Sequence, residues 1–572
     1  MAGSMISSDP RRNYAGPKPG MNTLFIVDYG REIAFSNLIR MSRVTWIKDY
    51  ASDFDGTLDA SGYVIDAGTA TIKTRFVIIA ASTSGMLETG TYALNWDGSG
   101  TPSIVATGGI SITETSASAN RKTYSITDWG DDDVMYLDVP LADTGAVTNV
   151  RFCYIDYEGT EGIGEENEFY PPLLQAYEPY KHCVRFMNWQ ATNQQNNRTS
   201  WDERRRETYR TYTHGPFSTG ANPSSAIEVQ PGVPLEVCVR FQNKLQGNGW
   251  YCIPAEYDGS SVSAFCEYLA DNVDPGLKVL IELGNENWNA GFDVNDVYQN
   301  LGLAEQAATG RFTAQNASYP FWAYSAWRSA SCMDIASSVF ADRGREDDLV
   351  RVLGLQVGNP ESKKAMDTDC AEVYGVDPPI PAYTKHDAAS TTSYWGGLQE
   401  PSWSDYGLSG NAASSLRDGL SANVCNLWAS GTYFDNVRNG TMPYESDVSE
   451  STSWAWWANE IKNVRGLEMY AYEGSQHVTT AGTVQGEPNA QEIVAQYDTE
   501  VFGNLIRDFH LLSENLGFQL ICHYVLVEKT DPDGYWGHVE SYTQLNDPDI
   551  LETKLKYRGL VEATGQHNKR NF

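Results

Sequence analysis

Two glutamates that follow apolar segments are the residues of this sequence best suited to chemistry. Glu286 stands in GNENWN (284–289), directly after the mostly apolar run KVLIEL. Glu473 ends a second such run, LEMYAYE, and opens the polar stretch EGSQH. Cleavage of a glycosidic bond needs two carboxyl groups, because a protonated one serves the departing oxygen while an ionised one attacks the anomeric carbon. The sequence therefore predicts Glu286 and Glu473 as a catalytic pair.

The segments that carry these glutamates lie in a region where strands and helices alternate. We expect strands at HCVRFMNW (182–189), PLEVCVRF (234–241), KVLIEL (278–283), LVRVLGLQ (349–356), LEMYAYE (467–473) and FQLICHYV (518–525), and weaker ones at 207–213 and 381–387. Helical apolar spacing occurs over 260–273, 320–343 and 490–516. Eight strands with intervening helices predict an α/β fold, a (β/α)₈ TIM barrel with insertions, over residues 161–572. Chemistry in such barrels lies at the carboxyl ends of the strands, so two strand-end glutamates would face one mouth.

The preceding region is predicted to be a separate, all-β domain. Runs of β-forming residues at 74–80, 90–96 and 149–155 are separated by Gly, Asp, Ser and Thr. We expect residues 21–160 to form an N-terminal β-sandwich accessory domain, which either braces the barrel or binds glycan. Residues 1–20 are polar and rich in Gly and Pro, which favours a flexible tail or tag.

Composition excludes several classes of partner. The chain has 572 residues, 41% hydrophobic and 20% charged, which is typical of a globular protein. A formal net charge of −33 argues against nucleic acid and against an anionic membrane surface, and no segment is apolar for long enough to insert into a membrane. Nine cysteines without CxxC spacing favour buried free thiols. The oligomeric state is left open.

The pattern of Asn285-Glu286 ending a fourth strand, with Glu473 ending a seventh, resembles the clan A glycoside hydrolases. That resemblance implies a retaining (β/α)₈ enzyme with Glu286 as acid/base, Glu473 as nucleophile, and Asn285 near the sugar 2-hydroxyl. The stretches GNENWN and YEGSQH also resemble "SNE-x-WN" and "YEGGQH" in uncharacterised bacterial proteins whose barrel follows a β-sandwich. Many clan A enzymes place Pro after Asn-Glu, where this chain has Asn287. The resemblance does not fix the sugar.

Polar residues near other strand ends are candidates for supporting roles. Arg185 either pairs with the nucleophile or bridges core strands to loops, and Glu282 is expected to orient it rather than to react. Asn188, near the same strand end as Arg185, is a further candidate for substrate binding. We expect the pKa of Glu286 to be raised by the charge of Glu473 and by desolvation.

Other candidate substrate-binding residues are histidines, a tyrosine and tryptophans. The histidines His477 and His523 could bind sugar hydroxyls. The clan resemblance implies a Tyr at the end of the sixth strand, for which Tyr383 is the candidate and His386 the alternative. Candidates for stacking on sugar faces are Trp189, Trp250, Trp288 and Trp536, and Trp189 is equally well explained as a rim residue.

The sequence thus predicts a retaining hydrolase that cleaves a polysaccharide or oligosaccharide by double displacement, with no metal and no cofactor. Such a substrate suggests an extracellular or cell-surface location, although the sequence shows no signal peptide. One alternative is a non-catalytic carbohydrate-binding protein that uses the glutamates only as hydrogen-bond acceptors. Another is a virion tail-associated protein that recognises glycans.

Overall fold

The computed structural model describes residues 16–49, 52–80, 85–130, 133–194, 199–213, 231–310, 312, 319–357, 359, 361–371, 378–395, 454–476, 498–514, 516–528 and 536–565.

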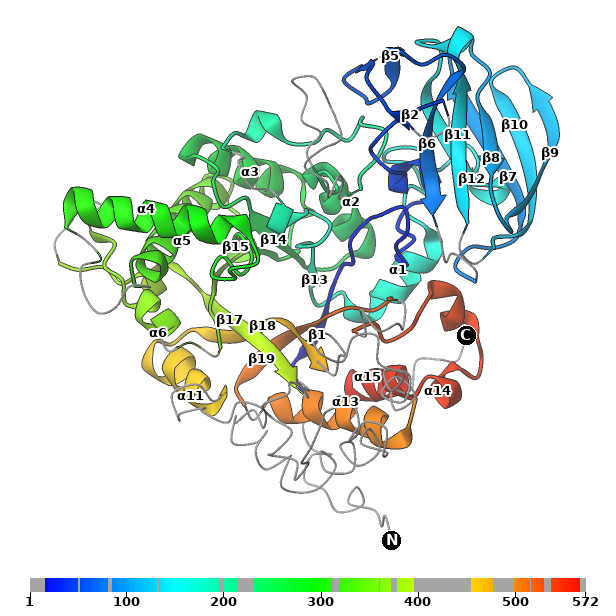
Figure 1. The fold of residues 1–572 in the computed structure, drawn as a ribbon. Helices are drawn as coiled ribbons and strands as arrows, with labels where there is room; N and C mark the ends of the chain where they lie inside the picture. Colours follow the sequence, from blue (N-terminus) through cyan, green and yellow to red (C-terminus); the bar gives the residue numbers. More distant parts are fainter. Residues whose placement is uncertain are drawn as a thin grey trace, which may run out of the picture.

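The central element is a closed barrel of eight parallel strands (Figure 1). In barrel order the strands are β1 (Lys18–Asn22), β13 (Val184–Arg185), β14 (Gly249–Ile253), β15 (Val279–Leu283), β16 (Leu349–Gly354), β17 (Ala388–Trp395), β18 (Glu468–Gln476) and β19 (Phe518–His523). This confirms the predicted barrel. Glu286 follows the fourth strand and Glu473 lies on the seventh.

The barrel begins earlier in the chain than expected. Its first strand is β1, whose Lys18–Asn22 segment had been assigned to the tail and to the start of the β-domain. Strand β1 pairs with β13 on one side and with β19 on the other, so it closes the barrel. The β-rich region is consequently inserted between the first and second barrel strands, and does not precede the barrel.

Three other expected strands are wrong. PLEVCVRF belongs to helix α2 (Leu235–Leu245), and the third strand is instead the short, fully buried β14. The segment 381–387 holds a 3₁₀ turn at Ala382–Lys385, and the sixth strand is the β17 segment that follows it. The weaker candidate at 207–213 is not a strand.

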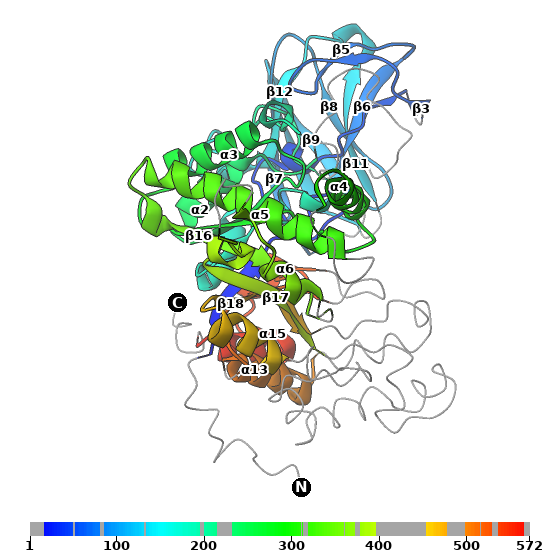
Figure 2. The same ribbon diagram turned by 90° about the vertical axis from the view of Figure 1, so that its left-hand side faces the viewer.

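Helices surround the barrel strands, as Figures 1 and 2 show. They are α1 (Pro171–Tyr177), α2, α3 (Gly259–Asn272), α4 (Asp293–Thr309), α5 (Tyr319–Ala341), α6 (Glu361–Met366), α11 (Trp454–Ala458), α13 (Glu500–Ser513), α14 (Ile550–Thr553) and α15 (Leu555–Ala563). Helices α3, α5 and α13 match predicted helices, although the predicted segment 490–516 extends into residues outside the described ranges.

The inserted region contains two larger antiparallel sheets. One is β12 (Thr148–Tyr154), β7 (Gly90–Asp97), β10 (Arg121–Asp128) and β9 (Ser111–Ser118), in that order. The other is β3 (Ser52–Asp53), β2 (Ile47–Lys48), β6 (Lys73–Ala80), β11 (Val134–Pro140) and β8 (Ser103–Ala106), and a two-stranded sheet joins β4 (Thr57–Leu58) to β5 (Val64–Asp66). In both views these sheets lie at one end of the molecule, beside the barrel (Figures 1 and 2).

Two further observations bear on the sequence predictions. The eight cysteines within the described ranges are free and buried, as expected. No helix in those same ranges is both long enough and apolar enough to cross a membrane.

Candidate active site

The chain turns sharply at the end of β15, and this turn presents Glu286. Gly284 has a φ of +66°, and a Cβ there would lie 2.1 Å from Asn287 Oδ1, so glycine is required. Asn287 is buried and its Nδ2 donates to Leu283 O at 3.0 Å. Glu286 itself has a φ of +42°, a left-handed conformation that non-glycine residues seldom adopt and that is common at functional sites.

A β-bulge on β18 brings two consecutive residues into the site. In the pairing with β17, Ala471 aligns with Thr391 and Glu473 with Thr392, which leaves Tyr472 as the extra residue. Strict alternation would send Tyr472 and Glu473 to opposite faces of the strand. In the structure both side chains belong to one group of polar residues around Arg185. The Tyr472 hydroxyl donates to Glu286, and Glu473 accepts from Arg185.

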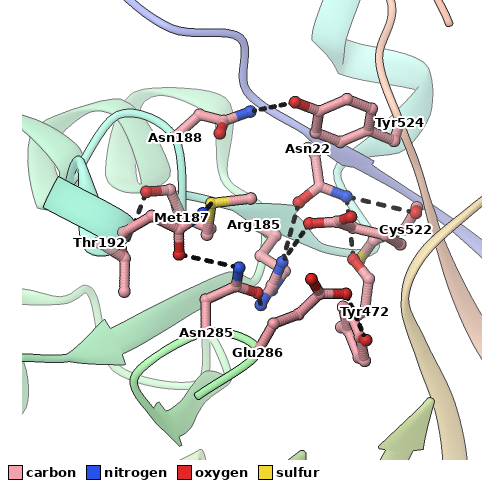
Figure 3. A network of polar contacts seen from close by, with 12 residues as sticks. Asn22, Arg185, Met187, Asn188, Thr192, Asn285, Glu286, Tyr472, Cys522 and Tyr524 are labelled. Carbon is pink, nitrogen blue, oxygen red and sulfur yellow. Dashed lines mark hydrogen bonds and ion pairs between the residues drawn. The ribbon is translucent and has the colours of Figure 1, made fainter. Parts of the chain in front are cut away.

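The fully buried guanidinium of Arg185, on β13, lies at the centre of this group. Its Nη1 donates to Glu473 Oε1 at 3.3 Å and to Asn22 Oδ1 at 3.4 Å. Its Nη2 donates to Glu282 Oε2 at 2.9 Å and to Asn285 Oδ1 at 2.7 Å. Figure 3 shows Arg185 between Asn22 and Asn285, with Glu286 and Tyr472 close by. One arginine therefore joins the first, second, fourth and seventh strands, so its two predicted roles, partner of Glu473 and bridge between strands, are both observed.

Each of the two glutamates accepts two hydrogen bonds from side chains. Glu473, nearly buried, accepts from Arg185 and, at Oε2, from the Tyr394 hydroxyl at 3.1 Å. Glu286 is partly exposed, and accepts from the Tyr472 hydroxyl at 2.8 Å and from Asn289 Nδ2 at 3.0 Å. The more accessible carboxyl is thus Glu286, and the more tightly held one is Glu473.

Burial affects the ionisation of two carboxyls at the site. Burial, reinforced by the charge of Glu286, raises the pKa of Glu473 to about 8, whereas Arg185 and Tyr394 oppose that rise. Burial also raises the pKa of Glu282. Two carboxyls, Glu282 and Glu473, contact the one guanidinium, and burial disfavours the ionised form of both. The rise expected at Glu286 stays a prediction, and the structure indicates a raised pKa at Glu473, the more deeply buried carboxyl.

Two of the predicted stacking tryptophans cannot stack on a sugar. Trp189 is fully buried, and its Nε1 donates to Glu32 Oε1 at 2.6 Å, so it is neither a platform nor a rim residue. Trp250 is also fully buried, inside the barrel, where its Nε1 donates to Glu282 Oε2 at 3.0 Å. Both indole N–H groups donate to buried carboxyl groups, and neither ring faces solvent.

Two other predicted residues, His523 and Tyr383, and the alternative His386 do not contact the two glutamates. His523 is buried, and its Nε2 bonds His510 Nδ1 of α13 at 3.0 Å. Tyr383 precedes β17 and therefore lies at the wrong end of the sixth strand, and its alternative His386 is buried against Ser329. His477 lies outside the described residues.

Three predicted residues remain near the site. Trp288 is partly exposed, stacks on Trp322 with ring centroids 5.4 Å apart, and lies edge-on to Tyr472. Trp536 is partly exposed and packs edge-on against Tyr524 at 5.9 Å. The side chain of Asn188 is buried and donates to Thr23 O at 2.7 Å and to the Tyr524 hydroxyl at 3.4 Å (Figure 3).

Sequence reasoning missed four residues that contact this group: Asn22, Asn289, Tyr394 and Tyr472. Tyr394, near the end of the sixth strand, donates to Glu473 and occupies the place for which Tyr383 was the candidate. Tyr472 gave no signal, because a bulge is invisible to period-two alternation. Asn289 ends the GNENWN stretch, so its position close to Glu286 in the sequence is a signal for this contact. Within the described residues no three His, Cys, Asp or Glu side chains group as metal ligands would, and the expected absence of a metal stays a prediction.

Comparisons with known proteins add little to this geometry. No protein-family model and no curated protein matches the chain. Among solved structures, the chain is similar to a 4-O-alpha-L-rhamnosyl-beta-D-glucuronidase from Fusarium oxysporum 12S in complex with Rha-GlcA, with 11% identity and a TM-score of 0.34. The match covers 69% of this chain and 64% of that one. The case for a function therefore depends on the site itself.

Proposed function

We propose that this protein is a retaining glycoside hydrolase that uses Glu286 and Glu473 in a double displacement. One observation carries the proposal: glutamates from the fourth and seventh barrel strands belong to one hydrogen-bonded group centred on Arg185. Such a pair, on one mouth of a (β/α)₈ barrel, supplies both functions that glycosidic cleavage requires.

The contacts favour Glu473 as the nucleophile. It accepts from a guanidinium and a hydroxyl, both of which stabilise the ionised carboxylate that must attack the anomeric carbon. Glu286 is the more accessible carboxyl, and gives its proton to the departing oxygen. In the second step water attacks the glycosyl ester, and Glu286 takes the proton back as a general base.

The pH dependence follows from the shared proton. The pair is active only when it holds a single proton, which must reside on Glu286 when substrate is bound. Burial raises the pKa of Glu473 in the free protein, whereas Arg185 and Tyr394 oppose that rise and favour the ionised nucleophile. We expect a bell-shaped profile of kcat/KM.

We further propose that the substrate is a polysaccharide or oligosaccharide and that the protein acts outside the cell or at its surface. Trp288 and Trp536, both partly exposed beside site tyrosines, are the proposed stacking residues. The two antiparallel sheets of the insertion are proposed to form a β-sandwich that braces the barrel.

The test begins with a screen of polysaccharides, including bacterial exopolysaccharides, with chromatography of the products. Glu286→Gln and Glu473→Gln should each lower kcat by about 10³-fold or more, with little change in Tm. Glu178→Gln, a change at an exposed glutamate, is the matched control and should retain full activity. Normal turnover by either site variant would refute the assignment.

Two further measurements separate the alternatives. Azide should rescue Glu473→Gly and yield a glycosyl azide of inverted configuration, whereas the wild-type product keeps the substrate's configuration by NMR. Binding of a glycan without any turnover, with affinity unchanged in both glutamine variants, would instead support a carbohydrate-binding protein.

A further inference from the structure

A third carboxyl group lies directly beneath the proposed catalytic pair. Glu282, on β15, has a side chain only 3% exposed, and its Oε2 accepts from Arg185 Nη2 at 2.9 Å and from Trp250 Nε1 at 3.0 Å. Arg185 Nη1 simultaneously contacts Glu473, so one guanidinium is shared between Glu282 and Glu473. The proposed mechanism gives Glu282 no proton to transfer.

The neighbouring strand leaves room for this carboxyl. A Cβ at Gly354, the last residue of β16, would lie 2.5 Å from Glu282 Oε1, well inside van der Waals contact. Any other residue at 354 would therefore require the Glu282 carboxyl to shift. The barrel interior is thus shaped to hold a carboxyl at this place, with a cation and an indole N–H both directed at it.

The role of Glu282 follows from the movement of charge in the proposed reaction. When Glu473 attacks the anomeric carbon it becomes an uncharged ester, and Glu286 becomes a carboxylate as its proton leaves with the departing oxygen. The net charge of the site is unchanged, but the negative charge has moved from Glu473, which contacts Arg185, to Glu286, which instead contacts Tyr472 and Asn289. Arg185 would then be a buried cation with Glu282 as its remaining carboxylate partner.

We propose that Glu282 is a positioning residue that acts as the fixed counter-ion of Arg185 throughout the catalytic cycle. It draws part of the guanidinium away from Glu473 before the attack, which keeps that carboxylate nucleophilic. It also neutralises Arg185 after the attack, when a buried cation without a partner would be costly. Its effect on rate rests on the proposed function, whereas its charge does not.

The first test needs no substrate. Burial raises the pKa of Glu282, but the contacts with Arg185 and Trp250 oppose that rise. In protein labelled with ¹³C at glutamate Cδ, the Glu282 resonance should therefore keep the shift of a carboxylate from pH 5 to 8. In Glu282→Gln, the loss of a neighbouring negative charge should lower the pKa of Glu473 by about one unit. Trp250→Phe is the matched control, because it removes a hydrogen bond to Glu282 and no charge, and it should move the pKa of Glu473 much less.

A protonated Glu282 at pH 6, or an unchanged titration of Glu473 in Glu282→Gln, would overturn the counter-ion role. If Glu282→Gln does not fold, the Glu282 resonance can be assigned from its shift in Trp250→Phe, and the wild-type titration alone decides. This result is independent of hydrolysis, so it stands even if the protein cleaves no glycan.

The second test uses a substrate found in the screen. Glu282→Gln should lower kcat by about 10- to 100-fold with a much smaller change in KM, because Glu282 does not touch the sugar. Glu282→Asp, which retains the charge, should recover part of the rate. Equal rates for Gln and Asp would show that shape rather than charge matters at this position, and would refute the proposal.

Discussion

Tyr394 is the hydroxyl donor to Glu473, and its effect can be separated from that of Arg185. Tyr394→Phe removes the 3.1 Å bond to Oε2 and leaves the guanidinium in place. A hydrogen bond to a charged group contributes about 1.5–3 kcal/mol, so kcat/KM should fall by about 10- to 150-fold. Because Tyr394 lowers the pKa of Glu473, its loss should raise that pKa and move the acidic limb of the pH profile to higher pH.

The matched control is Tyr524→Phe. Its hydroxyl also lies near the site, but its bond is to Asn188 at 3.4 Å and not to either glutamate. This variant should leave the acidic limb where it is. A shift of the limb in both variants, or in neither, would show that the Tyr394 hydroxyl does not stabilise ionised Glu473.

At the scale of single residues the sequence pointed to two glutamates that the structure joins through one hydrogen-bonded group, but not to the side chains around them. Glu286 and Glu473 could be selected because each follows an apolar segment at the point where the sequence becomes polar. Trp189, in the turn after β13, and Trp250, on β14, were misjudged because the sequence does not say whether a side chain at such a position faces the core or the solvent. Tyr394 was missed because it is the residue before the last of AASTTSYW, a strand made mostly of small and hydroxylated residues and unlike the apolar strands that the sequence predicts.

Several elements were predicted wrongly because contacts with the rest of the barrel decide their structure. The strand KPGMN contains Gly and Pro, yet it is held between two neighbouring strands that provide its hydrogen bonds. Conversely, PLEVCVRF alternates apolar residues like a strand, but it forms a helix whose apolar face packs on the barrel. In both cases tertiary contacts outweighed local propensity.

The buried Glu32 links the segment after β1, helix α1 and the turn after β13. Glu32 Oε2 accepts from Leu24 N, after β1, at 3.1 Å and from the Tyr177 hydroxyl of α1 at 2.9 Å. Its Oε1 accepts from Trp189 Nε1, just beyond β13, at 2.6 Å. Burial raises the pKa of Glu32 to about 7 from an ordinary value of 4.5.

This shift predicts a pH-dependent stability. The folded state favours protonated Glu32, so the contribution is fully present below pH 4.5 and is lost as pH rises through about 7. Over that interval the free energy of unfolding should fall by about 3 kcal/mol from this group alone. Glu32→Gln should remove this dependence, as seen by urea unfolding of both proteins at pH 5 and pH 8.5. An identical pH slope in the variant and the wild type would contradict the prediction.

At the scale of the whole molecule, the inserted sheets and the barrel are held together by a buried arginine. Arg210 lies between β13 and α2, and reaches into the insertion. Its Nε donates to Gly62 O at 3.1 Å, its Nη1 to Ser42 Oγ at 3.0 Å, and its Nη2 to Arg43 O at 3.0 Å. Its guanidinium lies over the Phe76 ring of β6 at 4.1 Å, and burial lowers its pKa to about 10.

The insertion makes this contact important for the barrel. Because the inserted sheets connect β1 to β13, loosening them also loosens the two strands that carry Asn22 and Arg185. Arg210→Ala leaves several buried carbonyls without donors, so the free energy of unfolding should fall by about 2–4 kcal/mol. Differential scanning calorimetry and chemical denaturation measure this loss.

The control for Arg210→Ala is another arginine of the same segment. Arg206 is exposed, and its Nη2 contacts Asp202 at 3.3 Å from Oδ1 and 3.4 Å from the backbone O, so Arg206→Ala should change stability by less than about 0.5 kcal/mol. In the folded protein below its unfolding transition, Arg210→Ala should keep the kcat of the wild type, because the contacts of Arg210 are with the insertion and not with Glu286 or Glu473. Equal stability of the two variants would mean that the sheets and the barrel do not depend on this contact, and a loss of kcat without unfolding would mean that the insertion shapes the site directly.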